Sequence, residues 1–492
     1  MAESQTKDGS FDFDVIIIGA GISGINTAYY LHSQTPWLSY TILEGRSRIG
    51  GTWDLFNYPG IRSDSDMTTF GFSWNPWNRE ERLGTADQIR SYMRKSAAKY
   101  GIDKNIRCDR RVLSANWSTK FKFWTLIVAD NQGVTQTYRT KFIVLGTGYY
   151  NYDKAQKTTI PGLSNFTGTV VHPQFWPEQF DYSGKDVVVV GSGATAVTLI
   201  PSIAEKAKSV TMLQRSPGYI VARPMYAGKE TGFIPFIQAR LPSAAAKWLK
   251  RIRVVISSTI SYFYCIYFPE KARLMLRKAT IKLLPESISW NPHFNPQYNP
   301  WRQRMCLCPD GDFYAALRSG KANVVTDQIE TVTSTEIQLK SGRTLQPDVI
   351  ITATGLQLQF AGGIEIEVDG QKIDYSQKYT WKGTMIQDIP NLAFVVGYAN
   401  SSWTMGAEAM GQLLVRVLRR MKKRNASMAV PRLDGTQGTQ DKPVFDLSSN
   451  YVKHANQMFP RAGNGHWDYR RNYLVDILKA QFGDITKGLQ IE

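Results

Sequence analysis

Cysteine is scarce in this sequence, and its first residues are low in apolar side chains. The 492 residues include four cysteines, too few for a disulfide framework, and Cys306-x-Cys308 has no second pair that could complete a zinc site. The first residues, MAESQTKDGSFDF, are polar and lack the apolar core of a signal peptide. We therefore expect a cytoplasmic protein in a reducing compartment, without a metal centre.

Long hydrophobic runs are missing as well. The stretch Val254–Phe268 carries no charge, but serine and threonine interrupt it, and it is shorter than the roughly 20 residues needed to cross a bilayer. This pattern favours a buried or membrane-touching helix over a membrane span. Any membrane contact is therefore expected to be peripheral.

Acidic residues are outnumbered by basic ones, which gives a formal net charge of +18. Such a charge attracts nucleic acid, anionic membranes or phosphorylated cofactors. The basic residues are spread along the chain, with local clusters at 247–253 and 419–424, and no RNA-binding signature, zinc finger or basic zipper accompanies them. The clusters are typical of solvated helix faces, and we expect no nucleic-acid partner.

What the sequence does have is a nucleotide-binding pattern that occurs twice. Val15–Ile18 and Val187–Val190 are fully apolar, as strands buried on both faces of a parallel sheet are. Each runs into a glycine-rich turn, a helix and a second strand, Tyr40–Leu43 or Val210–Leu213. The turns are Gly19-Ala20-Gly21-Ile22-Ser23-Gly24 and Gly191-Ser192-Gly193-Ala194-Thr195-Ala196. This predicts an α/β protein with two Rossmann-like dinucleotide-binding domains.

The two copies end on opposite charges. In the first, the three glycines permit a tight turn, close approach to a pyrophosphate and close helix packing. Glu44 can accept hydrogen bonds from ribose hydroxyls and would repel a 2′-phosphate, so this copy suits FAD or NAD. In the second, Arg215 and Ser216 take that place, which suits the 2′-phosphate of NADPH. The alternative is an arginine on a solvated turn.

Domain boundaries follow from these copies. Strand-like segments at Trp124–Val128, Phe142–Leu145 and Val349–Thr352 extend the sheets, and the last two end in Gly-Thr-Gly and Ala-Thr-Gly, where the chain can pass close to a cofactor. The stretch from Pro224 to about Pro300 resembles a helical insertion in the second nucleotide fold. We expect an FAD-binding domain at 1–150 and 350–492, an NADPH-binding domain at 151–223 and 301–349, and the insertion at 224–300.

A flavoprotein of this kind could be a disulfide reductase, but no cysteine pair follows the first motif. A different signature precedes the second copy: Phe166-Thr167-Gly168-Thr169-Val170-Val171-His172-Pro173-Gln174-Phe175-Trp176-Pro177-Glu178. It resembles the Phe-x-Gly-x-x-x-His-x-x-x-Trp-Pro fingerprint of type I Baeyer–Villiger monooxygenases. That family usually has Asp or Gly at the last position, and the related N- and S-oxygenating enzymes usually have Tyr in place of Trp. The resemblance implies a hinge that couples NADPH binding to domain movement, formed by Phe166, Gly168, His172, Trp176 and Pro177.

Other segments extend the resemblance over nearly the whole chain, and bring it closest to the ethionamide-activating subgroup of mycobacteria. Gly50–Asp54 and Tyr58–Asp64 look like the family's flavin-cradling loop, while Tyr149–Asp153, Gln214–Pro217 and Gly397–Trp403 are similar to segments of the subgroup. Beyond the two glycine-rich turns, the cofactor-binding residues that the resemblance implies are Glu44, Thr52, Trp53, Asp54, Arg62, Asp64, Val112, Arg215 and Ser216.

The resemblance also implies a reaction. In this family FAD is reduced by NADPH and reacts with O2 to give a C4a-peroxyflavin, which converts ketones to esters or lactones. The protonated form of the same species can oxidise a sulfide to a sulfoxide. A fixed cation in a water-poor site would stabilise the anionic states, and arginine keeps its charge when it is desolvated.

The catalytic arginine of the family matches Arg304, with Asp64 as its partner carboxylate. Arg302 and Asp66 are the competing assignments. Gln303 stands where several relatives have a lysine that helps to bind the 2′-phosphate, so relaxed use of NADH is open. The alternative function is an N- or S-hydroxylating flavin monooxygenase without ketone activity. Aromatic residues near Trp403 and at His466-Trp467 are candidates for the substrate pocket, with core packing as the equal alternative.

Overall fold

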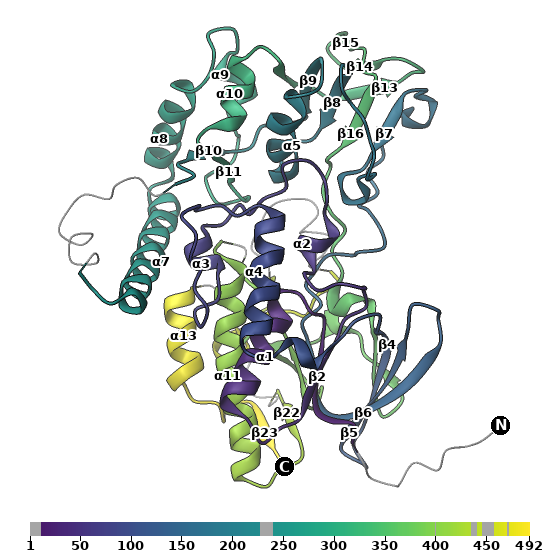
Figure 1. Ribbon diagram of the computed structural model, residues 1–492, viewed down its shortest axis with the longest axis vertical. Helices are drawn as coiled ribbons and strands as arrows, with labels where there is room; N and C mark the ends of the chain where they lie inside the picture. Colours follow the sequence, from purple (N-terminus) through teal and green to yellow (C-terminus); the bar gives the residue numbers. More distant parts are fainter. Residues whose placement is uncertain (1–10, 227–239, 399, 434–439, 445–456, 470–471) are drawn as a thin grey trace.

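The computed structural model describes residues 11–226, 240–398, 400–433, 440–444, 457–469 and 472–492. Two sheets with parallel cores are stacked along the long axis of the molecule, the first unit below and the second above in Figure 1. Each sheet grows from one of the two apolar strands that open a nucleotide-binding pattern. The expected α/β class with two dinucleotide-binding folds is confirmed.

The first unit is built around β1 (Phe13–Ile18), which pairs in parallel with β2 (Tyr40–Leu43) and β6 (Thr135–Leu145). Its apolar residues are buried because the sheet is covered on both faces. The strand order is β18-β17-β4-β5-β6-β1-β2-β3, with three strands branching beside β6. The remaining strands are β3 (Ile106–Arg107), β4 (Arg111–Ser118), β5 (Phe123–Ala129), β17 (Glu365–Val368), β18 (Gln371–Lys372), β19 (Thr380–Trp381), β20 (Met385–Ile386) and β21 (Leu392–Phe394).

The helices of the first unit pack around α1 (Ile22–Gln34), which follows the first glycine-rich turn. It lies against α11 (Trp403–Lys423), where the ring of Tyr30 occupies the space that a side chain at Gly411 would need. This close approach brings a helix from the C-terminal part of the chain to the first nucleotide-binding turn. The other helices are α2 (Thr52–Leu55), α3 (Met67–Phe70), α4 (Ala86–Lys99) and α13 (Tyr473–Phe482), and β22 (Ala429–Pro431) pairs with β23 (Leu489–Ile491).

The second unit has a five-stranded parallel sheet in the order β12-β9-β8-β16-β7. Because β16 (Val349–Thr352) pairs with β8 (Asp186–Val190) on one side and β7 (Thr169–Val171) on the other, the expected boundary at 349/350 cuts this strand. The second unit therefore extends to Thr352. Its other elements are β9 (Ser209–Gln214), β12 (Ala322–Thr326), α5 (Ala194–Ala204), α10 (Asp312–Arg318), the pair β10 (Ile220–Arg223) and β11 (Cys306–Pro309), and β13 (Ile329–Val332), β14 (Ile337–Leu339) and β15 (Thr344–Leu345).

The insertion is helical, as expected, but its longest helix is anchored on the first unit. The guanidinium of Arg251 donates to the backbone carbonyls of Thr68 at 2.9 Å and Gly71 at 2.8 Å, and it pairs with Glu408 at 2.9 Å. Both side chains are buried, so the prediction of a solvated basic face is wrong for Arg251. The helices of the insertion are α7 (Ser243–Tyr267), α8 (Pro269–Ile281) and α9 (Trp290–His293).

Candidate active site

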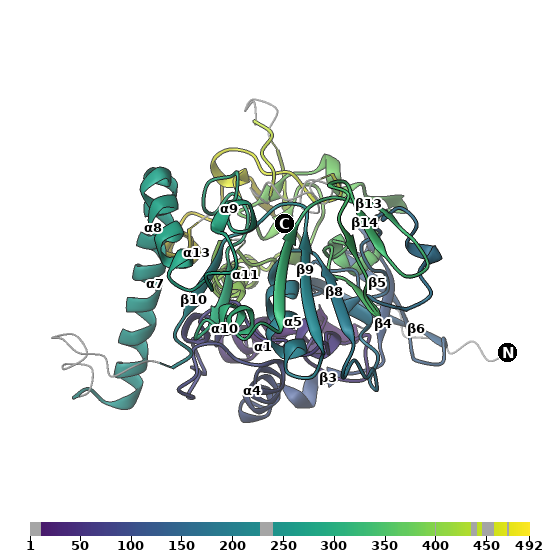
Figure 2. The ribbon, with the colours of Figure 1, turned by 90° about the horizontal axis from the view of Figure 1, so that it is seen from above.

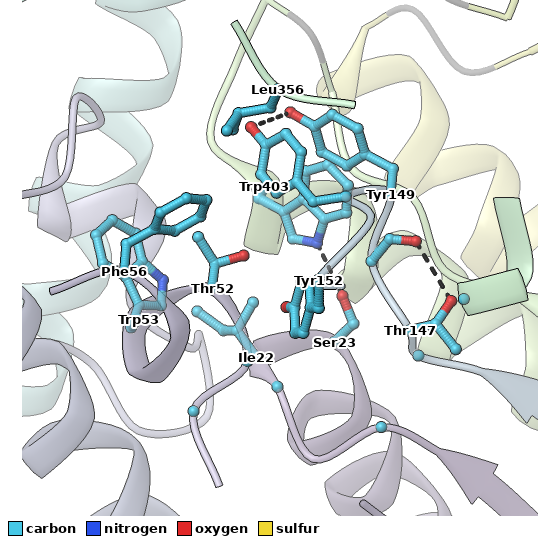
Figure 3. A pocket seen from close by; sticks show the side chains of 18 of the residues that line it. Ile22, Ser23, Thr52, Trp53, Phe56, Thr147, Tyr149, Tyr152, Leu356 and Trp403 are labelled. Carbon is cyan, nitrogen blue, oxygen red and sulfur yellow. Dashed lines mark hydrogen bonds between the residues drawn. The ribbon is translucent and has the colours of Figure 1, made fainter. Parts of the chain in front are cut away.

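A cavity of about 360 Å³ lies where the two units meet, within the size range of ligand pockets. Its walls come from the first glycine-rich turn, the end of β2, α2, the linker after β6 and the start of α5. Figure 3 shows Ile22 and Ser23 on one side, with Thr52 and Trp53 from α2 beside them. Segments far apart in the sequence therefore converge on one site.

The first turn brings bare backbone to this cavity. Gly19 has φ +102, and a Cβ there would lie 2.8 Å from the carbonyl oxygen of Gly146. A Cβ on Gly24 would overlap the carbonyl oxygen of Gly19, so the helix can approach the strand only without a side chain. Gly21 lines the cavity as the N-cap of α1 and makes no side-chain capping bond. Uncapped N–H groups at a helix N-terminus fit a pyrophosphate.

Glu44 stands at the end of β2 as the sequence indicates. Its carboxylate is buried and accepts hydrogen bonds from the backbone N–H groups of Ala20 at 2.7 Å and Arg46 at 3.0 Å. Burial raises the pKa of Glu44, and these two bonds act in the opposite direction. A fixed carboxylate on the cavity wall fits ribose hydroxyls and disfavours a second phosphate group.

Arginines give the cavity a positive lining. Guanidinium groups keep their charge and bind phosphate in bidentate fashion, so this lining also fits a dinucleotide. The arginines among the lining residues are Arg46, Arg62, Arg110, Arg111 and Arg304, and the acidic residues are Glu44, Asp64 and Asp153.

Of the other residues expected to bind the first cofactor, some line the cavity and one does not. Thr52, Trp53 and Val112 line the cavity. Asp54 does not belong to that lining: its side chain, on α2, is buried 2.8 Å from Arg46 and 3.2 Å from Arg48. Its charge therefore holds an arginine in place and does not face the cavity.

Ser23 lines the cavity next to two aromatic side chains. Its hydroxyl accepts a hydrogen bond from the indole N–H of Trp403 at 2.8 Å, and the indole stacks on Tyr149 with ring centroids 4.8 Å apart (Figure 3). Trp403 thus belongs to the cavity, as one of the two aromatic candidates. Trp467 is fully buried in the core, and neither it nor His466 is among the lining residues.

The second turn opens onto the same cavity. Gly191 has φ +139, and a Cβ there would overlap the carbonyl oxygen of Ala353. Ala194 and Thr195 begin α5, which also lacks a side-chain cap, and both line the cavity. The hydroxyl of Ser192 donates to the carbonyl of Ser216 at 2.9 Å, which ties this turn to the end of β9.

The end of β9 differs from the end of β2. Arg215 and Ser216 are exposed there, beside the second turn. Ala196, at the third position of the turn pattern, is buried against the sheet with a methyl group where the first unit has Gly24. An exposed guanidinium and hydroxyl fit the 2′-phosphate of NADPH.

Arg304 and Asp64 form an ion pair on the cavity wall. The Arg304 Nη2 atom lies 3.1 Å from Asp64 Oδ1 and 3.0 Å from Oδ2, and each side chain is about one third exposed, at 32% and 30%. Asp66 instead caps α3 by accepting from the Thr68 N–H at 2.8 Å. Arg302 is exposed and outside the lining. The geometry favours Arg304 and Asp64 over both competitors.

Arg62 forms a second bridge between the units. Its guanidinium holds Asp312, at the start of α10, with distances of 2.6 Å and 3.2 Å. Tyr58, the first residue of the Tyr58–Asp64 segment, lies beside Thr195 of α5, and burial raises its pKa to about 12. Loop 58–64 of the first unit therefore contacts the second unit at several points along the cavity.

The fingerprint segment lies outside the lining and packs as a bracket on the second unit. Phe166 is buried, and Gly168 leaves no room for a Cβ, which would lie 2.6 Å from the Asp348 carbonyl oxygen. Trp176 and Pro177 follow, with the Trp176 ring 5.6 Å from that of Phe180. This placement is that of a structural element beside the cavity.

His172 and Gln174 connect this bracket to the linkers between the units. The Nδ1 atom of His172 accepts from the Gln174 N–H at 3.2 Å, and burial lowers the pKa of His172, which favours the neutral ring. The Gln174 amide donates to the backbone carbonyl of Asn151 at 2.7 Å. Tyr152, the next residue, lines the cavity and lies beside Thr52. Gln174 and Tyr152 carried no signal of their own in the sequence.

Two dinucleotide-binding units that share one cavity define the chain as a two-cofactor oxidoreductase. Cys306 and Cys308 are unpaired, and neither is among the described residues that line the cavity. A redox-active disulfide beside the cofactors, as in a disulfide reductase, therefore has no support among these residues.

Comparison with known proteins identifies the family. The model of the pyridine nucleotide-disulphide oxidoreductase family matches residues 16–262. The chain is 42% identical over 480 residues to the FAD-containing monooxygenase EthA of Mycobacterium tuberculosis (strain ATCC 25618 / H37Rv), covering 97% of each chain. It is 41% identical to the probable FAD-binding monooxygenase AlmA of Acinetobacter baylyi, covering 96% of this chain and 95% of that one. The chain therefore belongs to the family of FAD-containing monooxygenases.

Solved structures share its fold. An oxidised steroid monooxygenase bound to NADP matches with a TM-score of 0.74 at 20% identity, covering 98% of this chain and 99% of that chain. An open structure of cyclohexanone monooxygenase matches with a TM-score of 0.73 at 18% identity, covering 98% and 100%. The prediction of a flavin monooxygenase is confirmed by the relatives, and the fold is the one that these monooxygenase structures share.

Proposed function

We propose that the chain binds FAD in the first unit and NADPH in the second, and uses O2 to convert ketones to esters or lactones and sulfides to sulfoxides. The ion pair of Arg304 and Asp64 carries this proposal, because it joins the two units on the wall of the cavity. The uncapped helix N-termini, Glu44 and Arg215 support the two cofactors. The relatives EthA and AlmA are named as FAD-containing and FAD-binding monooxygenases, which agrees with FAD as the first cofactor.

FAD held here and reduced by NADPH would activate O2, so that one oxygen atom enters the substrate and the other leaves as water. The chain's own residues then have separate tasks. The guanidinium of Arg304 stabilises the negative charge that develops on oxygen as it is inserted, which a preorganised cation does without reorganising at the moment of reaction. Asp64 holds that guanidinium in place through contacts of 3.0 and 3.1 Å.

The fingerprint residues take a positioning role in this proposal. The bracket around His172 and Trp176 contacts the linkers but not the cavity, so it can transmit movement of the second unit without touching the reacting atoms. Gly168 and Phe166 fix one end of it on the second sheet. Pro177 then leads the chain away toward β8.

Incubation of the FAD-loaded enzyme with NADPH and panels of ketones and sulfides tests the proposal. Mass spectrometry of the products should show esters or lactones that carry one oxygen atom from labelled O2, together with sulfoxides. NADPH consumption without ester from any ketone, but with sulfoxide or hydroxylamine, would assign the chain to the N- or S-hydroxylating monooxygenases instead.

We propose a cytoplasmic location with peripheral membrane contact. The four cysteines are all unpaired, in agreement with a reducing compartment. Fractionation of the producing cell into soluble, salt-extractable and integral membrane proteins would test this. Recovery only after detergent extraction would contradict it.

A further inference from the structure

One side of the molecule exposes large apolar side chains on two neighbouring helices. On α7, Ile256, Ile260, Tyr264 and Tyr267 recur every three or four residues, so they share one face of the helix. They are exposed, Ile260 at 64%. On α13, Leu478 at 58% and Phe482 at 77% lie one turn apart in the same way. We refer to these six residues as the α7–α13 face.

The two helices pack against the same part of the core. Val255, on the inner side of α7, packs with Tyr398 and Met405, and Tyr473 at the start of α13 packs against the same cluster. Burial raises the pKa of Tyr473, whose side chain also lies beside Arg251 of α7. Both helices lie on the same side of the molecule in Figure 1 and in Figure 2. The inner sides are therefore used for packing, and the apolar outer sides are exposed.

The charge around this face is strongly positive. Residues 240–282 contain ten lysines and arginines and a single acidic residue, Glu270. Lys271 and Lys278 are exposed on α8, next to the apolar Leu274 and Met275, which are 51% exposed. Apolar and aromatic side chains flanked by basic ones are typical of helices that lie in the headgroup region of an anionic bilayer.

A membrane surface explains this composition better than a protein partner does. Protein interfaces are depleted of lysine, whereas five of the ten basic residues of 240–282 are lysines. Among the described residues, no helix is both long and apolar enough to cross a bilayer. We propose that the α7–α13 face docks on anionic lipid surfaces, with the apolar side chains entering the headgroup region and the basic residues binding phosphate; this rests on the peripheral membrane contact proposed above and assigns it a surface and a lipid class.

The test uses the FAD-loaded full chain and sedimentation with vesicles of phosphatidylcholine alone or mixed with phosphatidylglycerol. We expect binding to the mixed vesicles only, and release at about 0.5 M salt because screening weakens the contact. The variant Ile260→Glu, combined with Leu478→Glu, should weaken binding at least about tenfold, since two apolar contacts are replaced by repelled charges.

Val134→Glu is the matched control. Val134 is 61% exposed on the hairpin between β5 and β6, so the same change there should leave vesicle binding unaltered. FAD content and NADPH oxidation should be unchanged in all variants, which separates this proposal from the proposed function. Wild-type protein that does not bind mixed vesicles, or face variants that bind like wild type, would overturn the proposal. A wild-type dimer that dissociates in the Ile260→Glu variant would also overturn it, because the face would then join two copies of the chain.

Discussion

The two nucleotide-binding units share one plan but differ at two positions. At the third small residue of the turn, the first unit has Gly24, which touches the backbone of Gly19, and the second has Ala196, whose methyl group is accommodated in the core. At the end of the second strand, the first unit has the buried Glu44 and the second the exposed Arg215. The same fold thus accommodates a methyl group at this position in one unit and not in the other, and presents opposite charges.

This difference shows which features of the motif belong to the fold and which to the ligand. The uncapped helix N-terminus is common to both units, and it suits the pyrophosphate that all dinucleotides share. The charge at the strand end distinguishes one dinucleotide from the other. The variants below test these assignments.

The largest effect is expected from Gly24→Ala. The new Cβ would overlap the backbone of Gly19, which cannot move aside as a flexible side chain can. We therefore expect the free energy of unfolding to fall by at least about 3 kcal/mol. We also expect the purified protein to lose FAD. The mirrored change, Ala196→Gly, should cost only about 1 kcal/mol. Thermal unfolding and the FAD content of purified protein measure both. Equal effects in the two units would show that the difference in helix approach is not real.

Arg304→Ala removes the cation on the wall shared by the two units. We expect ester formation to fall about 10²- to 10³-fold, while FAD content and reduction by NADPH stay near wild type, because neither glycine-rich turn is altered. Arg302→Ala, two residues away and outside the cavity, is the control and should change activity less than about twofold. If the two variants exchanged their effects, the arginine would have been assigned wrongly.

Arg215→Ala tests the charge that separates the second unit from the first. Loss of an exposed guanidinium should raise the KM for NADPH about tenfold, with little change in the KM for NADH, which has no 2′-phosphate. Lys208→Ala removes another exposed cation of the same unit and should leave the ratio of the two KM values unchanged. Equal weakening of both coenzymes by Arg215→Ala would remove the argument for 2′-phosphate recognition.

As the pH falls, we expect FAD retention by the first unit to decrease a few-fold before the second unit is affected. Burial raises the pKa of Glu44 above its usual 4.5, so the carboxylate is protonated earlier than an ordinary one as the pH falls. Lys208 and Ser209 lower the pKa of Asp186 in the second unit, which therefore stays charged. FAD fluorescence after ultrafiltration between pH 7 and 4.5 measures the release.

The sign of the linkage separates this release from unfolding. A carboxyl group whose pKa is raised in the folded state favours that state at low pH, and its contribution is lost as the pH rises through the folded pKa. Protonation of Glu44 should therefore release FAD while the circular dichroism signal persists. Glu44→Gln should show no such pH dependence. Simultaneous loss of both signals in wild type would point to acid unfolding elsewhere.

The sequence predicted what depends on local pattern. Val15–Ile18 and Val187–Val190 had to be buried strands because β-branched residues on both faces leave no polar side, and the turns that follow them place Gly21 and Ala194 at the cavity. The pairing of Asp64 with Arg304 came from the family resemblance, and the structure brings the two side chains together.

What could not be predicted depends on contacts between distant segments. An apolar run such as Val349–Thr352 fits any parallel sheet, so its sequence does not reveal that it pairs with β8. Asp54 looked like a cofactor ligand, but its direction depends on Arg46 and Arg48, which the motif does not include. The burial of Arg251 likewise depends on Glu408, which is 157 residues away.

Through the buried Arg251, α7 connects the two units. The insertion leaves the second unit after β10 and returns to it at β11, yet its longest helix is clamped to the first unit by Arg251. The inner side of that helix packs on Tyr398, which lines the cavity. A ligand on the outer surface of α7 and a ligand in the cavity would therefore both contact this packed unit, the first directly and the second through Tyr398. If occupancy of one site changes affinity at the other, thermodynamic reciprocity requires the converse by the same factor.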